Sequence, residues 1–314
     1  MGALATRFRT SVSHALHGLG LVTGCSGVLA QRMPVRRILM LHGVADGDLS
    51  ATDFERNLRW LRDRFRIVPL GTLIQSMQDA SPPRRDIALT FDDGLGNHFS
   101  AAYPILQKLQ IPATFFVCPD LMERNVWLWN HEVRARLKTL PHAAFRAFCR
   151  GIGAAPTDAA TLMAWMKSLT LAQRQGIEAE VRQATPAFTP TAEDRQRFDL
   201  MRPEQLRALD PTLITVGSHT LTHPILPGLD DASLAREVSQ SREQLEQQLD
   251  RVVDLFCYPN GANDVRVRAA VARSYRAAVA TQPGFVDAAT RDLFCLPRIS
   301  MPASTATLAW RLWR

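Results

Sequence analysis

The stretch that decides the fold is Asp86–Gly94, which reads Asp-Ile-Ala-Leu-Thr-Phe-Asp-Asp-Gly. Its middle is almost continuously apolar, a pattern typical of a strand in a parallel sheet that is covered on both faces. The strand then ends in two adjacent carboxylates, Asp92 and Asp93, and their repulsion and loss of water must be relieved by a cation or a proton. Asp-Asp-Gly is also ordinary turn chemistry. The stretch by itself therefore leaves both a polar turn and a functional site open.

Strand and helix patterns alternate along the chain on both sides of this stretch. Short apolar runs are separated by segments whose apolar residues have helical spacing. We predict further strands at 37–43, 67–70, 113–118, 213–217, 253–258, 277–281 and 295–299. Alternation of this kind predicts an α/β fold with a parallel sheet. About seven or eight strands favour one closed or nearly closed barrel, so we expect a distorted (β/α)7–8 barrel.

The alternation stops between Pro119 and Met201. This stretch has a helical pattern throughout and contains Trp127, Trp129 and Trp165. It is too long for an ordinary connection between a strand and a helix. We therefore predict a helical cap, inserted at about 119–201, over one end of the sheet. Its tryptophans can stack on a sugar ring or form the core of the cap, and we favour the core.

The segment before the barrel is basic. The chain has 314 residues and a net charge of +7, and no acidic residue precedes Asp46. Five arginines lie in that part: Arg7, Arg9, Arg32, Arg36 and Arg37. Such a segment is typical of a solvated helix or a membrane-surface contact, and no nucleic-acid motif is present. We divide the chain into a basic, helical N-terminal segment (1–36) and a barrel domain (37–314).

The compartment is less strongly indicated. The first residues resemble a poor signal peptide, and Val22-Thr23-Gly24-Cys25 resembles a lipoprotein cleavage box. The five cysteines are widely spread and contain no Cys-x-x-Cys pair, which argues against a disulfide framework. We expect a cytoplasmic protein associated with the inner membrane, and a periplasmic protein or lipoprotein is the alternative.

Three of the predicted strands end in unusual polar residues. His42 follows the first, Asp92 and Asp93 follow the third, and His219 and His223 follow the strand at 213–217. In a parallel barrel these ends share one face. Two imidazoles and one carboxylate leave a coordination position open, which is the layout of catalytic zinc. The second carboxylate is then free to act as a base on water.

These residues carry a specific resemblance. Thr90–Gly94 (Thr-Phe-Asp-Asp-Gly) and Ser218–Pro224 (Ser-His-Thr-Leu-Thr-His-Pro) resemble the polysaccharide deacetylase family, the NodB-homology domain of carbohydrate esterase family four. The similarity runs from about Arg37 to Met301 and includes Ile111–Val117 and Tyr258–Gly261. It implies a distorted βα barrel that removes N- or O-acyl groups, usually acetyl from N-acetylated sugars, with a divalent metal. Zinc is the metal we expect.

The resemblance also implies a role for each residue. Asp92 is the base that deprotonates the water. The backbone near Asn260, with Tyr258 in the same motif, faces the substrate and the oxyanion. The implied metal ligands are Asp93, His219 and His223.

The sequence departs from the common family pattern in two places. Cys257 stands where the family usually has the arginine that orients the base, and Asn260 stands where it has an aromatic residue. We hypothesise that Arg298, on the last predicted strand, replaces this arginine by pairing with Asp92. The late histidine that acts as general acid is also missing, because no histidine follows His223.

His42 is our candidate for the missing acid. Leu39-Met40-Leu41-His42 resembles family branches in which an early strand ends in Tyr-His and that histidine takes the acid role. The plainer interpretation is a hydrogen-bonded histidine that closes a strand.

We therefore predict a metal-dependent hydrolase. It would remove an N-acyl group, most simply N-acetyl, from an amino sugar in a bacterial polysaccharide such as an exopolysaccharide or in its lipid-linked precursor. The alternatives are a deformylase or O-acetyl esterase on a related glycan, and a non-catalytic carbohydrate-binding barrel. A glycan or lipid-linked sugar is the expected partner, with peripheral membrane contact through the N-terminus.

Overall fold

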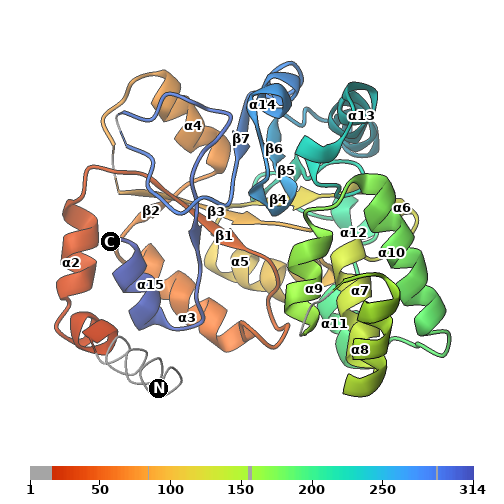
Figure 1. Ribbon diagram of the computed structural model, residues 1–314. Coiled ribbons are helices and arrows are strands. Elements are labelled where there is room, and N and C mark those ends of the chain that lie inside the picture. Colours follow the sequence, from red (N-terminus) through yellow and green to blue (C-terminus); the bar gives the residue numbers. More distant parts are fainter. Residues whose placement is uncertain (1–15, 84, 155–157, 288) are drawn as a thin grey trace.

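A curled parallel sheet forms the centre of the molecule (Figure 1). The computed structural model describes residues 16–83, 85–154, 158–287 and 289–314. The strand order is β7-β6-β5-β4-β3-β1-β8, and β2 also pairs with β3. The strands are β1 (Arg37–Leu41), β2 (Arg66–Ile67), β3 (Asp86–Phe91), β4 (Ala113–Val117), β5 (Ile214–Ser218), β6 (Leu255–Cys257), β7 (Ala277–Val279) and β8 (Ile299–Ser300). The pairings between these strands are parallel.

Helices follow most of the strands and cover the sheet. Outside the insertion the helices are α2 (Cys25–Arg32), α3 (Ala51–Arg62), α4 (Leu70–Gln78), α5 (Tyr103–Leu109), α12 (Pro203–Arg207), α13 (Asp231–Leu249), α14 (Val265–Ala272) and α15 (Thr305–Arg311). Each α/β unit therefore runs as the sequence predicts, although β2, β6 and β8 are shorter than the predicted runs.

The sheet curls into a half-barrel. Its last segment contacts both sheet edges: the Leu296 N–H donates to Ala278 O on β7 (3.0 Å), and Ile299 pairs with Leu39 of β1. The prediction of an α/β fold with a distorted barrel is confirmed. Only this short last segment joins the two edges of the sheet.

The core explains why β3 lies at the centre. All six residues of β3 are buried, and successive side chains pack on opposite faces of the sheet. Phe91 contacts the rings of Phe54 and Phe115, with ring centroids 5.9 and 5.0 Å apart. The apolar run therefore fixes the point at which Asp92 leaves the sheet.

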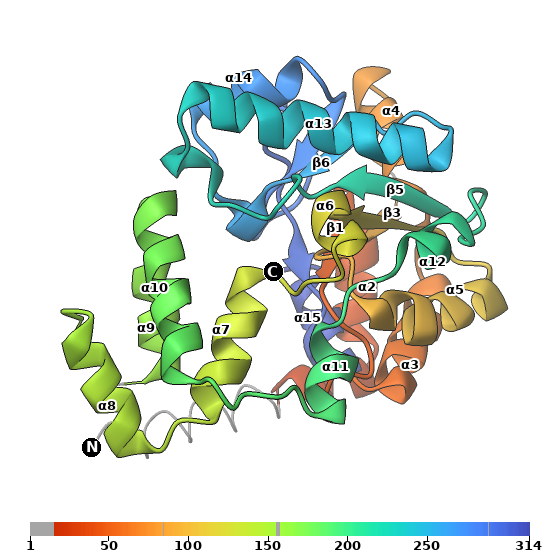
Figure 2. The same ribbon diagram turned by 90° about the vertical axis from the view of Figure 1, so that its right-hand side faces the viewer.

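Six helices precede α12 in the described part of the chain between β4 and β5. They are α6 (Pro119–Glu123), α7 (Trp129–Lys138), α8 (His142–Gly151), α9 (Ala159–Met166), α10 (Leu171–Ala184) and α11 (Ala192–Phe198). Figure 2 shows α7 to α10 gathered in a lobe beside the strands. This lobe has its own core, in which Trp129 is buried and against which Trp165 packs. We call α7 to α11 the cap.

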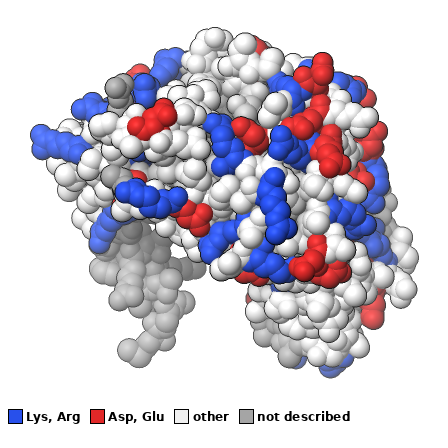
Figure 3. Space-filling model, turned by 90° about the horizontal axis from the view of Figure 1, so that it is seen from above, with Lys and Arg blue, Asp and Glu red and all other residues white. Residues whose placement is uncertain are grey.

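The N-terminal segment lies against the body. The first fifteen residues of the predicted segment 1–36 are outside the described residues, and residues 16–22 and α2 are helical. Arg37 anchors its end, because its guanidinium donates to Ala30 O (2.6 Å) and Leu312 O (2.7 Å). In the described part of the chain, no helix combines the length and apolarity that a membrane crossing requires. Basic and acidic side chains are interspersed on the face that Figure 3 shows.

Candidate active site

The carboxyl ends of β1, β3 and β5 meet at a pocket of about 580 Å³. The cap forms part of its wall, through residues of α7 and α11. Six of the predicted site residues line it: His42, Asp92, Asp93, His219, His223 and Asn260. The parallel register brings these positions together, because every strand that carries one of them points toward the same end of the sheet.

Asp93, His219 and His223 form a compact group. Asp93 Oδ1 lies 3.4 Å from Nε2 of His219 and 3.4 Å from Nε2 of His223. All three side chains are buried, and one ligand atom from each lies within 4.8 Å of the other two. Asp93 and His223 have positive φ angles of 75° and 59°, so the backbone is held in an uncommon conformation to present them.

The surroundings of these ligands fit a metal ion. Nδ1–H of His219 donates to Cys257 O (2.7 Å), which leaves Nε2 as the nitrogen that can bind a metal. Burial would raise the pKa of Asp93, but hydrogen bonds from His219 and His223 outweigh it and hold that pKa well below its ordinary value. A buried carboxylate that stays ionised between two imidazoles is a typical donor set for zinc.

Glu237 of α13 holds the loop that carries the two histidines. Its carboxylate accepts from the Leu221 and Thr222 N–H groups (2.9 Å each) and from Thr222 Oγ1 (2.6 Å). Glu237 is itself buried. Our sequence analysis missed this residue, since nothing marks it among the other polar residues of a long amphipathic helix.

Arg298 pairs with Asp92, as we hypothesised. Nη1 donates to Oδ1 and Nη2 to Oδ2, at 2.7 Å each, and both side chains are buried. The guanidinium is fixed by further bonds to Ala280 O (2.7 Å) and Thr90 Oγ1 (3.0 Å). Burial would raise the pKa of Asp92, but Arg298 outweighs it and lowers that pKa to about 2. Asp92 is therefore a carboxylate at any neutral pH.

Cys257 lies at the same pair. Its Sγ accepts from Arg298 Nη2 (3.2 Å), so the thiol contacts the guanidinium that takes the place of the family's usual arginine. Burial raises the pKa of the Cys257 thiol. Asp92, His219 and Cys257 form a second group of close ligand atoms. We assign the metal to Asp93, because both oxygens of Asp92 are already bonded to Arg298.

His42 is exposed and lies at the pocket, beyond the end of β1. Its positive charge, when present, lowers the pKa of both Asp92 and Asp93, so the imidazole is within electrostatic reach of the two carboxylates. Its backbone carbonyl accepts from His98 Nε2. The side chain is thus placed where it can meet a substrate.

Tyr258 and Asn260 have different environments. The Tyr258 side chain is buried and donates its hydroxyl to Phe294 O (2.8 Å), so the structure does not bring it to the pocket. Asn260 lies in the short 3-10 turn η3 (Pro259–Gly261), with φ 57°, and lines the pocket. Its Oδ1 accepts from Lys167 Nζ of the cap (2.6 Å). This hydrogen bond therefore links η3, which we predicted to face the oxyanion, to the cap.

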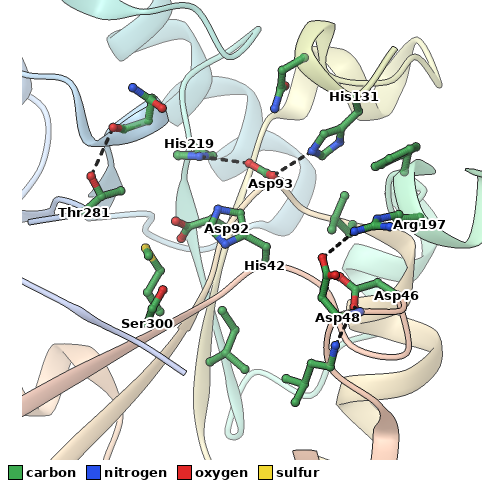
Figure 4. A pocket seen from close by; sticks show the side chains of 18 of the residues that line it. His42, Asp46, Asp48, Asp92, Asp93, His131, Arg197, His219, Thr281 and Ser300 are labelled. Carbon is green, nitrogen blue, oxygen red and sulfur yellow. Dashed lines mark hydrogen bonds and ion pairs between the residues drawn. The ribbon is translucent and has the colours of Figure 1, made fainter. Parts of the chain in front are cut away.

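His131 of α7 is a site residue that we did not predict. Figure 4 shows that His131 and His219 approach Asp93 from opposite sides. His131 Nε2 lies 3.5 Å from Asp93 Oδ2, the oxygen that the other two histidines do not contact. Burial lowers the pKa of His131 to about 4, so the imidazole is neutral at pH 7. The sequence held no signal for it, because it lies in the insertion and outside any motif.

Comparison with known proteins places this site in a family. A family model described as polysaccharide deacetylase matches residues 79–278. YxkH of Bacillus subtilis (strain 168), provisionally named a polysaccharide deacetylase, is 22% identical over 270 residues, which are 83% of this chain and 70% of YxkH. The poly-beta-1,6-N-acetyl-D-glucosamine N-deacetylase of Staphylococcus aureus (strain MSSA476) is 31% identical over 70 residues, 22% of this chain and 24% of that protein.

Solved structures share the fold. The deacetylase PplD of Streptococcus pyogenes, in complex with acetate, matches with a TM-score of 0.60 and 18% identity over 89% of this chain and 99% of that one. IcaB from Ammonifex degensii matches with a TM-score of 0.58 and 15% identity, over 90% of this chain and 98% of that one.

Proposed function

This chain belongs to the polysaccharide deacetylase family, hydrolases that act on the C–N bonds of N-acetyl sugars, and from that premise we propose a specific reaction. The substrate is an N-acylated, most simply N-acetylated, amino sugar in a bacterial polysaccharide or in its lipid-linked precursor. The observation that carries this proposal is the ionised Asp92–Arg298 pair directly beside the Asp93, His219 and His223 group.

Asp93, His219 and His223 would hold a divalent metal, and we propose zinc. When bound, the ion supplies a Lewis acid for the acyl carbonyl and lowers the pKa of water. The chain's own groups do the rest. Asp92, kept ionised by Arg298, accepts the proton of the attacking water. The backbone at Asn260 faces the developing oxyanion. His42 protonates the leaving amine.

The experiment that tests this proposal is acyl release followed by proton NMR. The full chain is incubated with N-acetylated oligosaccharides and lipid-linked amino sugars, with added zinc or with a chelator. We expect acetate release that needs the metal and is abolished in Asp92→Ala. Formate would identify a deformylase, and acetate from O-acetylated substrates alone would identify an esterase. No release from protein shown to hold one metal would contradict the proposal.

We also propose that the N-terminal segment contacts the cytoplasmic side of the inner membrane. Five large apolar side chains are exposed within residues 16–29: Leu16, Leu19, Val22, Val28 and Leu29. Only three more are exposed elsewhere among the described residues: Val126, Val252 and Val265. An apolar cluster in a basic segment suits an anionic lipid surface, and the five free cysteines suit a reducing compartment.

A further inference from the structure

The cap places an arginine close to the metal ligands. Arg134 lies three residues after His131 on α7, and residues at this spacing share one helix face. His131 contacts Asp93, and both His131 and Arg134 line the pocket. One helical turn rises about 5 Å, so the backbone of Arg134 lies about one turn along α7 from that of His131.

A lysine from another cap helix lies at the same pocket. Lys167, the residue that ends α9, is half-buried and donates to Asn260 Oδ1 (2.6 Å). Burial and the positive charge of Arg134 lower the pKa of Lys167, and the charge of Asp93 raises it. The ammonium is therefore within electrostatic reach of both Arg134 and Asp93.

Several other charged side chains of the pocket have partners of their own. Arg197 pairs with Asp48 (2.5 Å), and Asp92 pairs with Arg298. Asp46 Oδ1 accepts from the Asp48 and Leu49 N–H groups (3.1 and 3.2 Å) and so stabilises its own loop. Within the described part of the chain, neither Arg134 nor Lys167 forms an ion pair with a carboxylate. Two cations that repel each other in a pocket are stabilised by an anion placed between them.

We propose that Arg134 and Lys167 form a subsite for an anionic group, a carboxylate or a phosphate, on the glycan next to the acylated sugar. The proposal rests on the proposed function and narrows its substrate to an acidic glycan or a phosphate-linked precursor. Guanidinium and ammonium groups form short, charge-assisted hydrogen bonds with both kinds of oxyanion. An anion that is bound equally in the ground state and the transition state lowers KM with little change in kcat.

The test compares acyl release from three N-acetylated oligosaccharides of equal length: neutral, carboxylate-bearing and phosphate-bearing. Variants are Arg134→Gln, Lys167→Gln and the charge-preserving Lys167→Arg. Arg150→Gln is the matched control, because Arg150 is an exposed cap arginine on α8 that does not line the pocket. All reactions are run at one ionic strength.

We expect the native chain to prefer at least one anionic substrate by at least about tenfold in kcat/KM. Arg134→Gln and Lys167→Gln should reduce this preference several-fold, mainly through KM, while Lys167→Arg and Arg150→Gln keep it. The substrate that shows the preference distinguishes carboxylate from phosphate. Equal rates on all three substrates, or a preference that survives both glutamine variants, would overturn the subsite.

A failure of the proposed function gives a different result. No acyl release from any of the three substrates would count against the hydrolase, and the subsite would then be judged by binding. Calorimetric titration with a glucuronic-acid disaccharide, a phosphorylated disaccharide and their neutral analogue measures the subsite directly. Binding of an anionic disaccharide in preference to the neutral one, lost in Arg134→Gln, supports it. Equal or absent binding of all three, or a preference that survives in Arg134→Gln, contradicts it.

Discussion

Asp92, the proposed base, is held ionised by an arginine from the far end of the chain. Asp92 follows β3, and Arg298 comes one residue before β8. Both oxygens of the Asp92 carboxylate accept a hydrogen bond from the guanidinium. Arginine is the side chain whose planar guanidinium makes two such parallel bonds at once. The family usually has this arginine at the position of Cys257 on β6, whereas here Arg298, just before β8, bonds the carboxylate.

We predict that Arg298→Lys lowers kcat/KM at least about tenfold, because a lysine cannot hold both oxygens of the base. The pKa of Asp92 is lowered to about 2 in the native protein. Loss of the paired bonds raises it, so the acidic limb of the pH–rate profile should move to higher pH. Acetate release measured across pH checks this.

Arg276→Lys, in the ion pair with Asp254 away from the pocket, should leave the profile unchanged. An unshifted profile in Arg298→Lys would contradict the assignment.

His131 is predicted to support the metal rather than the substrate. As a neutral imidazole it can direct Nε2–H at Asp93 Oδ2 and leave Oδ1 for the ion. Loss of such a partner typically lowers metal affinity about 10–100-fold. We expect His131→Ala to do so, measured by competition with a chromophoric chelator. His142→Ala, an exposed histidine of the same cap, should not change the affinity. Equal affinities in the two variants would show that His131 has no role at the metal.

At the scale of elements, a partly exposed cluster of charged side chains joins two helices of the cap. Glu132 of α7 accepts from Arg136 (2.8 Å) and from Arg182 of α10 (2.7 and 3.0 Å). These bonds join the helix that carries His131 and Arg134 to its neighbour. Glu132 therefore ties α7 to α10, and the cap as a whole presents seven residues to the pocket: Trp129, Asn130, His131, Arg134, Lys167, Arg197 and Phe198.

We predict that Glu132→Gln lowers the free energy of unfolding by about 1 kcal/mol at pH 7, a modest value because Arg182 is half exposed. Burial raises the pKa of Glu132, but its bonds to Arg182 and Arg136 outweigh this and lower it below the ordinary 4.5. The stabilisation is therefore present above pH 4.5 and is lost as the pH falls through the lower, folded value.

Thermal melts at pH 7 and pH 3 measure this difference. We expect a loss of about 2 °C at pH 7 and a smaller loss at pH 3. Glu180→Gln, an exposed carboxylate on α10, is the control and should melt like the native chain. Equal melting temperatures of Glu132→Gln and Glu180→Gln at pH 7 would contradict a stabilising role of the Glu132 ion pairs.

At the scale of the whole molecule, the apolar surface is unevenly distributed. Leu19 and Val22 are 61% and 86% exposed in the N-terminal segment, and Val252 and Val265 are 71% and 74% exposed elsewhere. We predict that Leu19→Asp with Val22→Asp reduces binding to phosphatidylglycerol vesicles several-fold, because two apolar contacts with lipid become charged. Vesicle sedimentation of the full chain measures the bound fraction.

The matched control is Val252→Asp with Val265→Asp, which changes equally exposed valines outside the segment. It should bind like the native chain. If both double variants bind alike, the segment is not the membrane contact. Light scattering of the same variants tests the alternative, in which the exposed apolar side chains bind a second copy of the chain.

The sequence by itself determined the order of strands and helices, and it predicted which residues could hold a metal. It could do so because these features are local: an apolar run, a helical spacing, two carboxylates or two histidines directly after a strand. The same local patterns predicted the curled sheet. They also predicted that the polar residues lie at one edge of it, because parallel strands end at the same edge.

Only the tertiary structure decided which distant residues complete the site. Arg298 reaches Asp92 because the last segment contacts both edges of the half-barrel, and the sequence could suggest this pair only as a hypothesis. His131, Arg134 and Lys167 reach the pocket because the cap packs over the sheet, which no periodicity encodes. Tyr258, expected beside the substrate, turns into the core instead. The direction of a side chain depends on what packs around it, and that is set by contacts between residues far apart in the chain.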